Sequence, residues 1–572
     1  MSSPVSLVAN ASRTRPAPAL VFVAAVLGLF LLARFPGHPD ELTLAHLARW
    51  PLEVPLAVLL LLILPSTRTR AFRALLVVSL AALLLLRLAD IGSYLAFGRA
   101  FSPLAELHLI GQGWSLASRT VGRAEAGVTV VFSLLVLALV TALLYRGLGA
   151  AAELTPTVRR QLLRATLVVL LAGAVAWGAQ RIGGTDLGVR ADVGAEFVER
   201  IERLRRTVAD QAEFATALDA DPLDSRPPPT FAALEGLDVI VLFVESYGRS
   251  YLDAPRFAAD TRAGLERIGA ELTRAGLSAR SGWADSPIRG GRSWLAQATL
   301  ASGLPLTNQA RFDRLLGSER RSLHRLFGDA GWRTAAVLPI VDGEWVEGAW
   351  YGVERFVDGP SLGYAGLDFG YVPMPDQYTL AAFERELRGG AEEPLFATVG
   401  LLGSHAPWTP LALPVPWEGI GDGALFDGSH RFGGPLSWSD PEPVRTMYAR
   451  SLELTLTRIG EYLVRHAAGG LFVVVGDHQP AHVIAGWAPN AHVPIHLVAT
   501  DPVLLERLPA THFSAGMVPD TDAPALPLAA LRELLASVFE TAPPGAVVAT
   551  ATERAPDTAA GGSDDPGVAL PR

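Results

Sequence analysis

The sequence contains no cysteine, so neither a disulfide nor a thiolate metal site is possible. Any transition metal must therefore be held by histidine, carboxylate or hydroxyl groups. The chain also lacks a block of basic residues that could neutralise many phosphates, and its formal net charge is -9. This charge balance makes nucleic acid an unexpected partner.

The composition predicts two kinds of folded unit in one chain. The 572 residues are too many for one ordinary core. Half of them are hydrophobic, yet 18% are charged. A membrane portion fused to a water-soluble portion gives such an average.

Five apolar stretches occupy the first third of the sequence. They cover Leu20–Leu32, Leu42–Leu64 (interrupted by Glu53), Ala71–Leu88, Val128–Leu144 and Leu162–Trp177. Since a hydrocarbon core needs roughly 20 apolar residues per helix, we predict a five-span transmembrane region over residues 1–182. No small-residue cleavage site follows the first stretch, so we expect it to be retained rather than removed as a signal peptide.

Arginines predict the orientation of these spans. They precede span one, separate spans two and three, and separate spans four and five: Arg13, Arg15, Arg68, Arg70, Arg73, Arg146, Arg159, Arg160 and Arg164. By the positive-inside bias these segments face the cytoplasm, although Arg99, Arg119 and Arg123 lie in a loop expected on the other side. We therefore predict a multi-pass bacterial inner (plasma) membrane protein whose remainder, from about Arg181, is periplasmic.

The rest of the chain predicts an α/β domain. Residues 183–233 read as an amphipathic helix and a linker, 234–540 as the catalytic domain, and 541–572 as a disordered tail. Apolar runs predict buried strands at Leu237–Val244, Ala335–Leu338, Leu395–Leu402, Leu471–Val475 and Val493–Val498. Helical patterns alternate with them at Asp260–Ala275, Ser293–Ala301, Arg320–Ala330, Gln377–Arg388 and Pro443–Ala467. This alternation favours three layers around a mainly parallel sheet.

Three of the predicted strands end in polar groups. Glu245-Ser246-Tyr247-Gly248 follows the first, Ser404-His405-Ala406-Pro407 the third, and Asp477-His478-Gln479-Pro480 the fourth. Because ligands of open α/β sheets bind at the carboxyl ends of strands, two carboxylates and a histidine there predict a divalent cation site.

Gly290-Gly291-Arg292-Ser293 supplies a candidate nucleophile. The glycines permit close backbone approach, and Ser293 would open a helix whose N-terminal amides attract anions. A cation would activate the Ser293 hydroxyl for attack on phosphorus. Arg292 either steadies a phosphate oxygen or is merely solvated.

Residues from about Leu237 to Pro502 resemble the sulfatase-like branch of the alkaline phosphatase superfamily, in particular lipoteichoic acid synthases and related phosphoglycerol transferases. The resemblance rests on Val-Glu-Ser-Tyr-Gly, Gly-Arg-Ser and Gly-Asp-His-Gln-Pro. It implies five spans before an α/β alkaline-phosphatase-like (sulfatase) domain outside the cytoplasm. It also implies one metal, commonly Mn²⁺ with Zn²⁺ or Mg²⁺ as alternatives, held by Glu245, Ser293, Asp477 and His478.

The same resemblance implies two substrate contacts. His405 matches the histidine of a Ser-His-x-Pro segment, and Trp345 loosely matches a tryptophan beside the phosphoglycerol headgroup. The nucleophile is Ser where lipoteichoic acid synthases have Thr, a chemically minor change. The Cys/Ser-x-Pro-x-Arg signature that sulfatases need for formylglycine is missing after Ser293, so transfer of a phospho-group is favoured over sulfate hydrolysis.

Other polar and aromatic residues receive structural interpretations. We expect His482, His492 and His496 to be structural rather than a second metal site. Arg87 and Asp90 are spaced to pair at the end of span three, where snorkelling is the simpler explanation and a lipid-headgroup path the alternative. We expect the tryptophans at Trp408, Trp417 and Trp438 to serve packing rather than to form a substrate rim.

The sequence thus predicts a transferase. A phospholipid, such as phosphatidylglycerol or phosphatidylethanolamine, would donate its headgroup phosphate to Ser293, and a hydroxyl of an envelope glycan or lipid would accept it. The alternatives are a membrane-tethered phosphodiesterase, phosphatase or sulfatase that uses water, and a non-catalytic sulfatase-like binding module.

Overall fold

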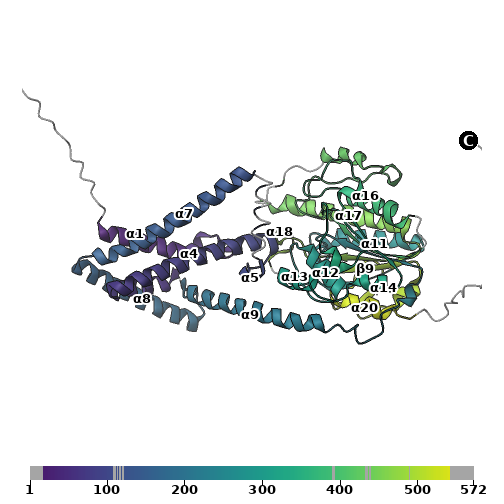
Figure 1. Ribbon diagram of the computed structural model, residues 1–572. Helices are drawn as coiled ribbons and strands as arrows, with labels where there is room; N and C mark the ends of the chain where they lie inside the picture. Colours follow the sequence, from purple (N-terminus) through teal and green to yellow (C-terminus); the bar gives the residue numbers. More distant parts are fainter. Residues whose placement is uncertain are drawn as a thin grey trace, which may run out of the picture.

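The chain forms a helical half and an α/β half that the long helix α9 joins (Figure 1). This computed structural model describes residues 17–541, except 107–110, 112–113, 115–117, 119–121, 390–392, 432–435, 437–439 and 488–489. The tail predicted beyond 541, Arg13, Arg15, Arg119 and Trp438 therefore lie outside the described residues.

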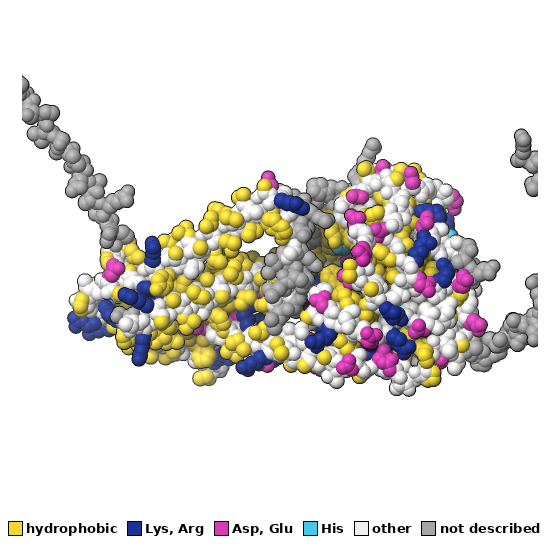
Figure 2. All heavy atoms as spheres, viewed as in Figure 1, with side chains coloured by type: hydrophobic (Ala, Val, Ile, Leu, Met, Phe, Trp, Pro, Cys, Tyr) yellow, Lys and Arg dark blue, Asp and Glu magenta, His cyan; other side chains and the backbone are white. Residues whose placement is uncertain are grey.

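Apolar helices build the first half. They are α1 (Pro18–Ala33), α3 (Glu53–Ile63), α4 (Ser66–Phe97), α7 (Arg123–Gly149) and α8 (Pro156–Gly183). In the described part of the chain, three helical segments are long and apolar enough to cross a membrane: Thr67–Leu95, Arg123–Glu153 and Pro156–Gly183. The helices α1 and α3 are apolar but shorter. Apolar side chains predominate on the visible surface of this half, whereas acidic and basic side chains are interspersed over the other half (Figure 2).

Basic side chains gather at the end of the helical half farthest from the sheet (Figure 2). Arg73, near the start of α4, lies 4.0 Å above the ring of Tyr145, near the end of α7. Arg159, near the start of α8, donates from Nε to the carbonyl of Leu62 at 2.9 Å. The arginines near the starts of α4 and α8 therefore share one end of the bundle.

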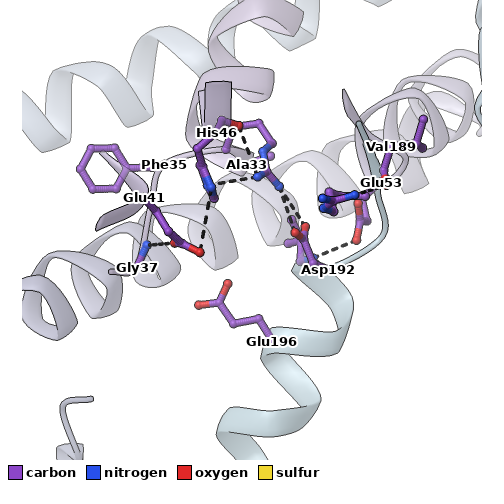
Figure 3. Close-up of polar contacts among 12 residues, drawn as sticks. Ala33, Phe35, Gly37, Glu41, His46, Glu53, Val189, Asp192 and Glu196 are labelled. Atoms are coloured by element: carbon purple, nitrogen blue, oxygen red, sulfur yellow. Dashed lines mark hydrogen bonds and ion pairs between the residues drawn. The ribbon is translucent and has the colours of Figure 1, made fainter. Parts of the chain in front are cut away.

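Helix α9 (Val193–Asp219) is fastened to the helical half at its N-terminus (Figure 3). Arg34, at the end of α1, is 2% exposed and donates from Nη1 to both Asp192 oxygens, at 3.0 and 3.1 Å. Glu53 Oε1 accepts from the amides of Val193 at 2.9 Å and Gly194 at 3.3 Å. The carboxylate that interrupts the second apolar stretch thus caps α9, where a negative charge stabilises a helix.

Arg87 and Asp90 of α4 do not snorkel to water, so that interpretation is wrong. They are only 6% and 4% exposed. Arg87 Nη2 pairs with Glu196 Oε2 at 2.5 Å, and Arg200 Nη2 pairs with Asp90 Oδ2 at 2.6 Å. Glu196 and Arg200 both belong to α9. The sequence alone predicts that this helix follows the spans, but it does not predict that the helix packs against them.

In the described part of the chain, nine strands form the sheet of the second half, in the order β10-β4-β9-β8-β3-β7-β5-β6 with β11 beside β4. Their bounds are β3 Asp238–Val244, β4 Ser278–Asp285, β5 Arg333–Leu338, β6 Arg355–Asp358, β7 Leu395–Leu401, β8 Gly470–Gly476, β9 His492–Ala499, β10 Phe513–Ala515 and β11 Leu526–Pro527. The strands from β8 to β6 pair in parallel, whereas β9 is antiparallel to both β8 and β4. The sheet is mixed, with five parallel and three antiparallel strand pairings in the described part of the chain.

Helices cover both faces of this sheet (Figure 1). On one face lie α11 (Ala258–Arg274), α16 (Asp376–Phe383) and α17 (Pro441–His466); on the other lie α12 (Ser293–Ser302), α13 (Gln309–Leu316), α14 (Leu323–Asp329) and α20 (Ala530–Val538). Strand β3 serves both cores, because Ile240 and Leu242 point into one and Val239 and Val241 into the other. Such two-sided burial explains its continuous apolar sequence.

The shorter helices occupy loops. They are α2 (Leu44–Leu47), α5 (Pro103–Glu106), α10 (Ser250–Asp253), α15 (Gly348–Tyr351), α18 (His482–Ala485) and α19 (Pro502–Glu506). A small parallel pair, β1 (Trp50–Pro51) with β2 (Val189–Arg190), links the loops before α3 and α9.

The end of α9 is held by a buried ion cluster. Arg532 of α20 donates to both oxygens of Asp221, at 2.9 and 2.7 Å, and Arg320 Nε lies 3.3 Å from Asp221 Oδ2. All three side chains are at most 3% exposed. Burial tends to raise the pKa of Asp221, but the neighbouring Arg532 guanidinium lowers it below the ordinary value.

Replacing Asp221 by alanine is expected to destabilise the α/β half by about 3–5 kcal/mol, because two buried guanidinium groups lose their carboxylate. The matched control is Asp224→Ala. Asp224 pairs with Arg321 at 3.2 Å but is 64% exposed, so its loss is expected to cost less than about 1 kcal/mol. Denaturant unfolding of the purified chain measures both, and equal losses would contradict the buried cluster's role.

Candidate metal and nucleophile site

The sheet brings two of the predicted motifs together. Strands β3 and β8 are parallel neighbours, and Val244 is paired with Gly476. Glu245 and Asp477, which follow these two residues, therefore leave the same edge of the sheet side by side. The end of β4 lies at this edge too, and its following loop leads to Ser293 at the start of α12.

Glu245, Asp477 and His478 form a compact buried cluster. One ligand atom from each lies within 4.8 Å of the others. The Ser293 hydroxyl donates to Glu245 Oε2 at 2.8 Å, and its oxygen lies 3.4 Å from His478 Nε2. The four predicted metal ligands are thus in one place.

Hydrogen bonds fix the orientation of these ligands. Asp477 Oδ1 accepts from the amides of Ser246 at 2.8 Å and His478 at 2.6 Å, which leaves Oδ2 facing the cluster. His478 Nδ1 lies 2.8 Å from the carbonyl of Gln479. This contact assigns a hydrogen to Nδ1, so Nε2 is the nitrogen that faces Glu245 and Ser293 and that would bind a cation once it is deprotonated.

The charges of the cluster suit a cation. Burial favours a raised pKa of Glu245, but His478 and His405 outweigh it and lower that pKa. Burial and the charge of Glu245 raise the pKa of Asp477. Burial opposes protonation of His478, yet the two carboxylates raise its pKa. Asp477 and His478 therefore favour their protonated forms at the place where a divalent cation would bind. The donor set of carboxylates, imidazole and hydroxyl fits such an ion.

The backbone around the cluster is strained. Ser246 and Arg292 are non-glycine residues with φ of 56° and 69°. Such conformations persist only where the surroundings enforce them, and they gather at functional sites. Gly476 is required, since a Cβ there would lie 2.0 Å from the carbonyl oxygen of Tyr247. The Gly-Asp-His motif thus needs its glycine for close approach to the Glu245 loop.

The His405 loop is anchored beneath the cluster. Asp376 accepts from the amides of Leu402 at 2.7 Å and Gly403 at 2.9 Å, and Ser404 donates to the carbonyl of Glu245. The ring of His405 stacks on Tyr371 with centroids 4.3 Å apart. The structure therefore brings the predicted substrate-contacting histidine close to the predicted metal ligand Glu245.

Arg292 and Trp345 have different surroundings. The Arg292 side chain is 5% exposed, and Nη1 lies 3.9 Å from Glu106 Oε1, so the solvated alternative is wrong. Burial lowers the pKa of Arg292 to about 10. Trp345 packs against Tyr351 and Phe356 and lines a cavity of about 10 Å³, room for about one water. A headgroup contact for Trp345 stays a prediction.

His496 and Trp408 are buried and hydrogen-bonded, as structural roles require, whereas the absence of a second metal site stays a prediction. His496 is buried between Ser281 Oγ at 2.7 Å and the Tyr247 hydroxyl at 3.1 Å. Among the described residues, His482 and His492 do not join the Glu245 cluster. Trp408 is 3% exposed and donates to the carbonyl of Ser404 at 2.7 Å, which confirms its packing role.

Several residues of the site escaped sequence reasoning. Ser246 Oγ donates to Glu245 Oε1 at 2.9 Å, and its place beside Glu245 in the motif was a usable signal. Asp376, Tyr371 and Glu106 reach the site from distant segments. No local pattern marks them, because their roles depend on tertiary contacts alone.

Comparisons with known proteins found similarities among solved structures. No family model and no curated protein sequence matches the chain. The chain is similar to the lipoteichoic acid synthase of Listeria monocytogenes, with 13% identity and a TM-score of 0.33 over 47% of this chain and 67% of that one.

Two further similarities concern phosphoethanolamine transferases. The C-terminal periplasmic domain of one from Campylobacter jejuni matches with 13% identity and a TM-score of 0.34, over 53% of this chain and 92% of that one. The integral membrane lipooligosaccharide phosphoethanolamine transferase A of Neisseria meningitidis matches with 11% identity and a TM-score of 0.43, over 92% of this chain and 95% of that one. These TM-scores are all below 0.5, so the function proposed below rests on the site of this chain.

Proposed function

We propose that this chain is a membrane-bound, metal-dependent transferase that moves a phosphoglycerol or phosphoethanolamine-type group from a phospholipid to an envelope glycan or lipid through a phospho-serine intermediate. One observation carries the proposal. The Ser293 hydroxyl, at the N-terminus of α12, donates at 2.8 Å to Glu245 within the buried cluster that Asp477 and His478 complete. A hydroxyl so placed beside a cation site and helix amides is suited to attack phosphorus.

The membrane arrangement supports a lipid donor. We propose that α1 and α3 cross the membrane together with the three longer spans, giving five spans over 1–182, and that 183–233 connects them to a catalytic domain at 234–540. The arginine-rich end of the bundle lies away from the sheet, and by the positive-inside bias this supports a periplasmic catalytic domain. The site then faces the outer leaflet of the inner membrane.

The residues of the site have distinct tasks. Glu245, Ser293, Asp477 and His478 would hold one divalent cation, with Mn²⁺ expected and Zn²⁺ or Mg²⁺ as alternatives; such an ion supplies Lewis acidity and charge neutralisation. Glu245 accepts the proton of Ser293 as the serine oxygen forms its bond to phosphorus, the bond from phosphorus to the diacylglycerol oxygen breaks, and that oxygen takes up a proton as diacylglycerol leaves. The acceptor hydroxyl then loses its proton and displaces the Ser293 oxygen, which is protonated again. The N-terminal amides of α12 stabilise the phosphate charge, and His405 and Arg292 contact its oxygens.

A mass-spectrometric experiment tests the proposal. The full chain in vesicles of phosphatidylglycerol or phosphatidylethanolamine, with Mn²⁺ and no acceptor, is expected to release diacylglycerol and to carry a phosphoglycerol or phosphoethanolamine adduct on the Ser293 peptide. Release of free headgroup phosphate without dependence on an acceptor would favour a hydrolase. Turnover of aryl sulfate but not of lipid would favour a sulfatase, and no diacylglycerol from either lipid would reject the lipid-donor function.

A further inference from the structure

A short helix of the membrane half reaches the catalytic site. Helix α5 (Pro103–Glu106) follows α4 in the segment that leads to α7, and it contacts both α9 and α13. Figure 1 shows it between the end of α4 and the α/β half. Helix α5 therefore connects the predicted spans with α13, the helix that follows α12 and its nucleophile.

Glu106, at the end of α5, is held rigidly. Its side chain is 1% exposed. One carboxylate oxygen accepts from the amide of Ser102 at 2.8 Å, and the other pairs with Arg99. The start of the same segment is fixed as well, because Asp90 accepts from the amide of Phe101 at 2.9 Å while it pairs with Arg200 of α9.

The fixed carboxylate faces the residue that precedes the nucleophile. Arg292 Nη1 lies 3.9 Å from Glu106 Oε1, and both side chains are at most 5% exposed. A free arginine side chain loses rotamer entropy when substrate orders it, and a rigid anionic partner can order the side chain before substrate arrives. The left-handed backbone of Arg292 adds a second constraint on the direction of this side chain.

We propose that Glu106 is a positioning residue that orients the Arg292 guanidinium toward the phosphate attacked by Ser293, so that the membrane half completes the active site. This inference rests on the proposed function. A buried ion pair is weak evidence for stability, because desolvation offsets most of its attraction. The Glu106–Arg292 pair joins the two halves of the chain, and Arg292 lies next to the nucleophile in the sequence. A role in shaping the substrate site explains this pair better than a role in stability.

The test is a double-mutant cycle in the full chain, reconstituted in mixed micelles with phosphatidylethanolamine or phosphatidylglycerol. Glu106→Gln is expected to lower kcat/KM for lipid about tenfold, mainly by raising KM. A loss of this size corresponds to one charge-assisted contact. Glu106→Asp, which keeps the charge, is expected to restore part of this loss. In the Arg292→Ala background, Glu106→Gln is expected to cause no further loss, since coupled residues are not additive.

A binding measurement separates positioning from folding. Inhibition by inorganic phosphate is expected to weaken about equally in Glu106→Gln and Arg292→Ala, with unchanged melting temperatures. Glu125→Gln, an exposed carboxylate in the first turn of α7, is the matched control and is expected to match the unmodified chain. If Glu106→Gln has a lowered melting temperature, Glu106→Asp is the deciding variant. A changed KM at a normal melting temperature supports the positioning role, and unchanged kinetics overturn it.

Two results would overturn the inference outright. Additive losses in the cycle would show that Glu106 does not act through Arg292. Full activity of Arg292→Ala would show that no guanidinium needs positioning. The second result would also remove Arg292 from the proposed phosphate contacts, but neither result overturns transfer through a phospho-serine, which fails instead if Ser293 forms no adduct.

Discussion

Ser293→Ala is expected to reduce diacylglycerol release by at least about 10³-fold, because removal of a covalent nucleophile costs several orders of magnitude in established enzymes. The rest of the cluster should survive the change. Asp477 keeps its bonds to the amides of Ser246 and His478, and Glu245 keeps its bond from Ser246 Oγ. Lipid turnover and bound Mn²⁺, measured on the same preparation, are therefore expected to separate: turnover is lost and the metal is retained.

Two further serine and threonine variants sharpen this result. Ser293→Thr keeps a hydroxyl at the start of α12 and is expected to retain measurable turnover. Ser537→Ala removes an exposed hydroxyl of α20, whose oxygen contacts only the carbonyl of Leu534 among the described residues, and is expected to change nothing. Persistent diacylglycerol release in Ser293→Ala would reject the phospho-serine intermediate. The same result would favour a mechanism in which water is the nucleophile.

The central strands could be predicted from sequence because both of their faces are buried. Strand β3 reads Asp-Val-Ile-Val-Leu-Phe-Val, and the segment predicted from Leu237 matches its observed bounds closely. Strand β4 was missed because it reads Ser-Ala-Arg-Ser-Gly-Trp-Ala-Asp, with three partly buried positions at its start. Since β4 and β9 form antiparallel pairs, this omission also hid the mixed character of the sheet.

The grouping of the four predicted metal ligands could be foreseen because each of them follows a recognisable strand or begins a helix. Parallel pairing of β3 and β8 then makes the proximity of Glu245 and Asp477 a consequence of topology. Arg292 was ambiguous because nothing near it in the sequence reveals its partner. Glu106 lies 186 positions earlier and reaches it only through the docking of α5, which local patterns do not report.

The charges of the predicted spans illustrate the same limit. Arg87 near the end of an apolar stretch has two explanations from sequence, a snorkelling side chain or a functional group. The structure gives a third, because α9 folds back and supplies Glu196. A helix that follows the last span can therefore neutralise charges within an earlier one. Hydropathy alone carries no information about that return.

Asp477→Asn is expected to abolish tight Mn²⁺ binding and to reduce lipid turnover on the order of 10³-fold, comparable to the loss of the nucleophile. The asparagine oxygen would keep the amide bonds of Ser246 and His478, so its NH₂ group would point into the cluster in place of Oδ2. The fold is thus retained while one anionic ligand becomes a donor. Asp329→Asn, at a 56% exposed carboxylate of α14, is the matched control and is expected to bind metal normally.

The same cluster predicts how metal binding depends on pH. In the ion-free protein the pKa of Asp477 is raised by burial and by Glu245, and the two carboxylates raise the pKa of His478. Both groups then hold protons that a cation must displace, so Mn²⁺ affinity should fall as pH is lowered and should rise toward alkaline pH. Calorimetry in buffers of different ionisation enthalpy is expected to detect proton release on binding. Binding without proton release, or equal Mn²⁺ affinity at pH 6 and pH 8, would show that the ion does not enter between these two side chains.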